Sequence, residues 1–158
     1  MSSTLVIGID PGSRATGWGV VRLDGRDLDL VGCGVIRLDP GKDLAERMMT
    51  LAERLGDVLE EHRPVQAAVE DVFVSRNPGA ALKLGQARGA ALAAVARTRI
   101  PVAAYAPAKV KRAVTGSGRA DKAQVQRMVQ AVLGMDKPPA QDAADALAVA
   151  ICHARSLR

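Results

Sequence analysis

The sequence predicts an α/β fold, with a mixed five-stranded sheet and helices on both faces. Three observations support this fold class. An unbroken apolar run near the N-terminus ends in Asp10-Pro11-Gly12, as expected of a buried strand that is closed by a turn. Two strand-like segments then flank Asp24-Gly25, a strong hairpin signal. Further along, segments with helical spacing alternate with short apolar runs, which is typical of helices packed on a sheet.

The first half of the chain is expected to supply four strands and one helix. In chain order these are strands at residues 5–10, 17–23 and 27–36, a helix at about 42–62 and a strand at 65–69. The strands are apolar runs bounded by turn residues. The helix has apolar residues at helical spacing between charged ones, and Pro64 closes it. The fourth strand, like the first, ends in acid, at Glu70-Asp71.

The second half is expected to supply one strand and four helices. In chain order these are a helix from Pro78 to about Arg97, a strand at 101–105, a short helix from Pro107, a helix at 122–133 and a last helix at about 141–155. Proline suits the first turn of a helix, and Asp121 is a suitable N-cap. The helix from Pro78 is small and apolar nearly all round, so it must be buried centrally or pack against another subunit.

With 158 residues and no linker or low-complexity tract, the chain is expected to form a single domain over residues 1–158. Cys33 and Cys152 lie in apolar contexts without metal-ligand spacing, so we expect reduced core cysteines. No apolar run approaches the roughly 20 residues that span a bilayer, and the first residues lack a signal-peptide layout. We therefore expect a soluble, cytoplasmic protein with no membrane partner.

Positive charge is concentrated in the second half of the chain. The net charge is +5, but residues 72–135 hold eleven Lys/Arg and one acid, whereas residues 1–71 hold thirteen acids and eight Lys/Arg. Such a field favours a polyanion, because contacts with phosphates release counterions. Aromatic residues are scarce, so the pattern favours a surface that binds a nucleic-acid backbone over one that stacks bases.

Four carboxylates fall at the ends of predicted elements: Asp10, Glu70, Asp142 and Asp145. The last two are three residues apart on a helix, which puts their side chains on one face. Asp10 and Glu70 become neighbours if their strands lie side by side, which the sequence permits without requiring it. Each residue also has an ordinary interpretation: Asp10 as a turn residue, Glu70 as the partner of an arginine, and the Asp142/Asp145 pair as a helix cap and helix-dipole partner.

A cluster of four carboxylates is unfavourable without a cation, because two carboxylates about 4 Å apart repel by roughly 4 kcal/mol at an effective dielectric near 20. Mg²⁺ prefers oxygen ligands and keeps several waters, so a few carboxylates on an open cleft suit it, and Mn²⁺ is an alternative. Two such ions can align the attacking water and the leaving oxygen of a phosphodiester. The chemistry expected of this cluster is hydrolysis of a nucleic-acid backbone.

Five collinear segments together resemble the RuvC family of Holliday-junction resolvases, which are ribonuclease-H-like endonucleases. The segments are residues 7–13 with 17–19, 69–73, 81–89, 122–126 and 142–148. The resemblance implies a ribonuclease-H-like sheet and a crossover junction endodeoxyribonuclease active in homologous recombination and DNA repair. It also implies that Asp10, Glu70, Asp142 and Asp145 are the catalytic metal ligands. Some relatives carry His at the position of Asp142, so its role as ligand or proton handler stays open.

The resemblance further implies partners and DNA contacts. A homodimer, joined through the helix from Pro78, would nick two strands of a four-way junction symmetrically, and a branch-migration motor complex is an expected partner. Lys111 and Lys122 match basic residues that contact DNA, and Phe73 matches an aromatic that wedges between bases at the junction centre. Further DNA contacts are expected at Arg76, Lys83 and Arg119.

Two other functions fit parts of the sequence. The segment from Asp10 to Ser13 with the following hairpin resembles the phosphate loop of actin-like or sugar-kinase-like ATPases, although those bind nucleotide between two domains. A DNA-binding module without catalysis is the other alternative. His153, two turns beyond Asp145, is expected to be a bystander.

Overall fold

The computed structural model describes residues 2–71 and 77–158. Within these two ranges, five strands form one sheet in the order β3-β2-β1-β4-β5, and five helices accompany them. The elements in chain order are β1 (Thr4–Asp10), β2 (Ala15–Asp24), β3 (Asp27–Arg37), α1 (Leu44–His62), β4 (Gln66–Glu70), α2 (Pro78–Ala96), β5 (Val102–Tyr105), α3 (Pro107–Thr115), α4 (Lys122–Val132) and α5 (Gln141–Ser156).

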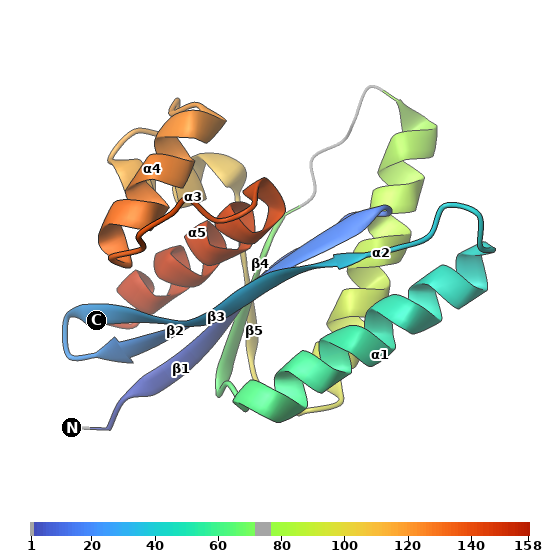
Figure 1. Ribbon diagram of the computed structural model, residues 1–158, viewed down its shortest axis with the longest axis horizontal. Coiled ribbons are helices and arrows are strands. Elements are labelled where there is room, and N and C mark those ends of the chain that lie inside the picture. Colours follow the sequence, from blue (N-terminus) through green and yellow to red (C-terminus); the bar gives the residue numbers. More distant parts are fainter. Residues whose placement is uncertain (1, 72–76) are drawn as a thin grey trace.

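The sheet is mixed, as the sequence predicts. β1, β2 and β3 are antiparallel neighbours, whereas β4 pairs parallel to β1 and β5 pairs parallel to β4. Gly25 in the hairpin between β2 and β3 has a φ of 59°, a conformation that glycine adopts without steric cost. Helices α3, α4 and α5 lie on one side of the sheet and α1 and α2 on the other, so the expected α/β class with helices on both faces is confirmed (Figure 1).

Alternation along the strands divides the apolar residues between two cores. On β1, Val6 packs into the core under α5, while Ile7 and Ile9 pack into the core under α1 and α2. Because side chains of a strand alternate between faces, Asp10 belongs to the same face as Val6 and lies on the α5 side. The same alternation on β4, with Ala68 under α5, puts Glu70 on that side too.

Helix α5 lies unusually close to the sheet, because glycines stand where it crosses β1 and β2. A Cβ atom at Gly8 would clash with the carbonyl oxygen of Ala146, and one at Gly17 would clash with the carbonyl oxygen of Asp142. These are backbone atoms, which cannot move aside without shifting the helix. The N-terminal turns of α5 therefore rest directly on the ends of the strands that carry acids.

Helix α2 is not buried centrally, which excludes one of its two expected environments. Its buried residues, Ala87, Ala91, Ala94 and Val95, lie toward the core that α2 shares with α1 and the sheet, whereas Leu82 is 63% exposed. An exposed apolar side chain on a helix of small residues is consistent with the other expectation, contact with another subunit.

Two further expectations concern the cysteines and the membrane. Both cysteines are free, with Cys152 buried and Cys33 half-buried. Within the part of the chain that the structure describes, none of the helices has the length and apolar character needed to span a bilayer.

Candidate active site

The first two carboxylates meet at the edge of the sheet where β1 and β4 end. The parallel register pairs Ile9 with Val69, so the next residues, Asp10 and Glu70, leave adjacent strands at the same level. The sequence did not determine whether Asp10 and Glu70 are neighbours, and the pairing of β1 with β4 shows that they are. Two parallel neighbours that both end in acid bring negative charge to one point of the sheet edge.

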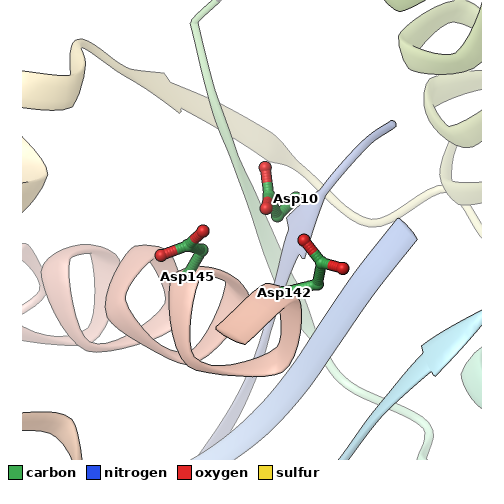
Figure 2. Close-up of side chains that lie close together, drawn as sticks. All are labelled: Asp10, Asp142 and Asp145. Carbon is green, nitrogen blue, oxygen red and sulfur yellow. The ribbon is translucent and has the colours of Figure 1, made fainter. Parts of the chain in front are cut away.

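The other two carboxylates come from the start of α5. Figure 2 shows Asp10 at the end of its strand facing Asp142 and Asp145 on successive turns of the helix. One carboxylate oxygen from each of these three residues lies within 4.8 Å of those from the other two. The N-cap of α5 is Ala140, whose methyl group makes no capping hydrogen bond, and Asp142 lies inside the first turn. The interpretation of Asp142 as an N-cap is therefore wrong.

All four carboxylates line one cleft of about 310 Å³. Lys111 of α3 and Lys122 of α4 line the same cleft, together with apolar side chains of α3, α4 and α5. Glu70 thus belongs to the cleft, although the tight group of three oxygens does not include it. The cleft combines a carboxylate cluster, supplied by the ends of β1 and β4 and by the start of α5, with the ammonium groups of α3 and α4.

Burial and mutual repulsion disfavour ionisation of this cluster. The pKa of Asp10 is raised from 3.8 to about 7, mainly by burial and then by the charges of Asp145, Glu70 and Asp142. Burial is also the main reason that the pKa values of Glu70 and Asp145 are raised. The ammonium of Lys122 opposes the shift at all three residues. The lysines therefore offset only part of the repulsion.

A divalent cation fits this donor set. Carboxylate oxygens are the ligands that Mg²⁺ and Mn²⁺ take from proteins, and three of them converge here within the span of a coordination sphere. After burial, the neighbouring carboxylate charges raise the pKa of Asp10, and such an ion would neutralise these charges.

The remaining acid at this edge, Asp71, has a different environment. It is paired with Arg88 of α2, with 3.5 Å between Oδ1 and Nη2. Among the described residues, no Lys, Arg or His side chain lies within 4.0 Å of the Glu70 carboxylate, so the interpretation of Glu70 as the partner of an arginine finds no support. The arginine pairs with the neighbouring residue instead, which leaves the Glu70 carboxylate to the cleft.

The basic residues expected to contact DNA are distributed over two regions of the described chain. Lys111 and Lys122 lie in the cleft, whereas Lys83 is exposed on α2 and Arg119 lines a separate hollow beside α4. Phe73 and Arg76, the other two expected contacts, fall outside the described residues.

His153 lies apart from the cleft, as expected of a bystander to the chemistry. It is buried, and its Nδ1 is 2.6 Å from the Tyr105 hydroxyl while its Nε2 is 3.0 Å from Gln66 Oε1. Burial lowers its pKa. These bonds tie the C-terminal half of α5 to β4 and β5.

The sequence did not lead us to the glycines against which α5 packs. Gly8, Gly17 and Gly19 were treated as parts of strands, yet each would clash with α5 if it carried a side chain. The available signal was their occurrence inside strand segments, where glycine is unfavourable and often marks the close approach of another backbone.

A mixed sheet of this order, with carboxylates gathered where its first and fourth strands end, is the fold and site expected of a ribonuclease-H-like nuclease. The family model "Crossover junction endodeoxyribonuclease RuvC" matches residues 6–153. The chain belongs to the RuvC family. This membership confirms the enzyme class expected from the sequence and contradicts the ATPase alternative.

Curated relatives and solved structures agree. The chain is 55% identical over 151 residues to the crossover junction endodeoxyribonuclease RuvC of Halorhodospira halophila, covering 96% of this chain and 90% of the relative. It is 51% identical over 150 residues to that of Marinobacter nauticus, covering 95% and 85%. The structure of Thermus thermophilus RuvC matches with a TM-score of 0.89 at 38% identity, covering 98% and 96%. Another T. thermophilus RuvC structure, in complex with a Holliday junction substrate, gives 0.89 at 36%, with the same coverage.

Proposed function

We propose that this chain resolves four-way DNA junctions by paired symmetric nicks, through divalent-metal-dependent hydrolysis of phosphodiester bonds. The single observation that carries the proposal is the convergence of Asp10, Asp142 and Asp145 within 4.8 Å, beside Glu70, in a cleft that two lysines overhang. The T. thermophilus relative in complex with a Holliday junction supports the choice of substrate. The reaction serves homologous recombination and DNA repair.

In this proposal the four carboxylates are the catalytic metal ligands, and Mg²⁺ is the metal, with two ions in each active site and Mn²⁺ as a substitute. Bound divalent ions would activate the attacking water and stabilise charge on the leaving oxygen. Glu70, at the end of β4, lines the same cleft, so the donor set extends beyond the tight group of three. Such an extended donor set suits two ions better than one.

The remaining groups of the cleft bind and orient the DNA. The ammonium groups of Lys111 and Lys122 lie on the helices above the carboxylates, where a phosphodiester entering the cleft would pass. Asp142, at the mouth of the cluster on the first turn of α5, is assigned as a ligand. Phe73, Arg76, Lys83 and Arg119 stay predicted DNA contacts of the same surface.

The biological unit in this proposal is a homodimer, because symmetric nicks need two active sites. The exposed, small-residue side of α2 supports that contact. Residues 1–158 act as one ribonuclease-H-like domain, since both cores pack against the same sheet. We further propose that the protein acts in the cytoplasm and that a branch-migration motor complex delivers the junction.

The test is cleavage of a synthetic mobile four-way junction with Mg²⁺, with both cut positions mapped. Wild type should give paired nicks at symmetric positions, and Asp10→Asn should bind the junction without cutting it. Asp57→Asn, which removes an exposed carboxylate from α1, serves as the matched control and should cut normally. Cutting by Asp10→Asn would remove Asp10 from the metal ligands, and binding by wild type without nicks in either Mg²⁺ or Mn²⁺ would favour a non-catalytic DNA-binding module.

A further inference from the structure

A second hollow, of about 420 Å³, lies on the far side of α4 from the catalytic cleft. We call it the arginine hollow and define it by Thr115, Ser117, Arg119, Gln124 and Arg127. It is formed by the loop between α3 and α4 and by the exposed side of α4, the helices above the sheet in Figure 1. No carboxylate lines it, in contrast to the catalytic cleft.

Four side chains of the arginine hollow, those of Ser117, Arg119, Gln124 and Arg127, have N–H or O–H groups left to donate hydrogen bonds. Gln124 Oε1 accepts from the backbone N–H of Asp121 at 2.8 Å, so its amide N–H groups are left to donate. Ser117 Oγ accepts from the backbone N–H of Arg119 at 3.2 Å, and its own proton has no acceptor among residues 2–71 and 77–158. Within the same described ranges, no carboxylate lies within 4.0 Å of the guanidinium of Arg119 or Arg127.

The loop that forms one wall has a defined geometry. Thr115 Oγ1 donates to the carbonyl oxygen of Lys111 at 2.8 Å and accepts from the backbone N–H of Ser117 at 3.2 Å. Gly116 ends α3 with a φ of 85°. These bonds hold the loop against the end of α3, so the hollow is built before any ligand arrives.

The arginine hollow and the catalytic cleft share α4 as a common wall. Lys122 and Val125 of α4 line the cleft, while Gln124 and Arg127 line the hollow. A helix with its side chains is about 10 to 12 Å across. A DNA strand that leaves the cleft past Lys122 and crosses the first turn of α4 reaches the hollow within a few nucleotides.

We propose that the arginine hollow binds backbone phosphates of the junction arm that leaves the catalytic cleft across α4. Guanidinium forks match phosphate oxygens in a bidentate manner, and a lining that holds two arginines and, among the described residues, no carboxylate suits an anion. The inference rests on the proposed function, because it takes its ligand from the DNA of that reaction. It adds Arg127, Gln124 and Ser117 to the contacts with DNA and extends the footprint beyond the cleft.

The test combines variants of the protein with neutralised phosphates in the DNA. Arg119→Ala with Arg127→Ala should weaken junction binding about tenfold per arginine and reduce the salt slope by about 2. The control variant, Arg26→Ala, removes one arginine charge from the β2–β3 turn, at the other end of the sheet. It should leave the binding constant and the salt slope near those of wild type. Arg127→Lys should restore part of the lost affinity.

Methylphosphonate linkages, which are uncharged, should then identify the phosphates. Neutralising the contacted phosphates, a few nucleotides from the cut, should weaken wild type but have no further effect on the double variant. A salt slope equal to that of wild type, or neutralised linkages that weaken both proteins equally, would overturn the inference. Binding is measured without divalent metal and therefore does not depend on cleavage. If wild type binds the junction through the arginine hollow but does not nick it when Mg²⁺ is added, the proposed function is overturned and this inference is not.

Discussion

Replacing the half-buried carboxylate of Asp10 by an amide should stabilise the metal-free protein. Ionised Asp10 lies among three other acids in a partly buried cleft, and its pKa is raised from 3.8 to about 7. Since one pKa unit corresponds to about 1.4 kcal/mol, this difference corresponds to about 4 kcal/mol of unfavourable free energy at pH 8. The Asn side chain must itself be desolvated, so we expect Asp10→Asn to gain about 2 to 4 kcal/mol.

The gain in stability of Asp10→Asn over wild type should depend on pH. Because the pKa of Asp10 is higher in the folded than in the unfolded state, folding gains stability as the pH falls from about 7 toward 3.8. Below 3.8 the carboxyl is protonated in both states, and above about 7 the stabilising contribution is lost. The advantage of Asp10→Asn over wild type should therefore be largest near pH 8 and vanish near pH 4.

The measurements are urea denaturation and thermal denaturation, both followed by circular dichroism at pH 8, with EDTA and then with Mg²⁺. In EDTA, the melting temperature of Asp10→Asn should exceed that of wild type by about 5 to 15 °C for a domain of this size. Mg²⁺ should stabilise wild type more than the variant and so narrow the gap. Asp57→Asn should match wild type throughout. Equal stability of wild type and Asp10→Asn in EDTA at pH 8 would refute the reasoning.

Three further predictions concern other parts of the molecule. Gly17→Ala should lower the free energy of unfolding, measured by urea denaturation, by about 1 to 3 kcal/mol and weaken Mg²⁺ binding, because the added methyl group meets the Asp142 carbonyl. The control is Gly56→Ala, at an open position of α1, which should not destabilise the protein. Equal stability of the two variants would contradict the close packing of α5 on Gly17. Lys111→Ala should weaken junction binding and lower the salt slope by about 1, and an unchanged slope would remove this lysine from the phosphate contacts. Leu82→Glu should convert the proposed dimer to a monomer in light scattering coupled to size exclusion, while a wild type that is already monomeric would exclude the α2 contact.

The order and type of the elements could be predicted from local patterns. The end of β1 at Asp10, the β2–β3 hairpin at Gly25 and the proline at the start of α2 all follow from turn and capping chemistry that acts over a few residues. The N-terminal cap of α4 is a further case, since Asp121 and Gln124 form the reciprocal pair of bonds with which a helix begins. These features need no knowledge of the tertiary structure.

The candidate carboxylates were predictable as a set but not as a site. Each was found at the end of a predicted element, and the spacing of Asp142 and Asp145 already put both on one helix face. Whether Asp10 and Glu70 lie side by side depends on the parallel pairing of β1 with β4, which joins residues about 60 positions apart in the chain. No local signal specifies such a pairing.

The sequence by itself determined the elements, their ends and the acids that close them, because those depend on interactions between near neighbours in the chain. The tertiary structure alone decided three matters: that Asp10 and Glu70 share a sheet edge, that α5 lies close enough for Asp142 and Asp145 to reach them, and that burial raises the pKa of Asp10. The physical reason is that strand pairing, helix seating and desolvation all depend on contacts between distant segments. Gly17 illustrates the difference. In the sequence it is a residue unfavourable in a strand, and in the fold its lack of a side chain lets the backbone of Asp142 lie against β2.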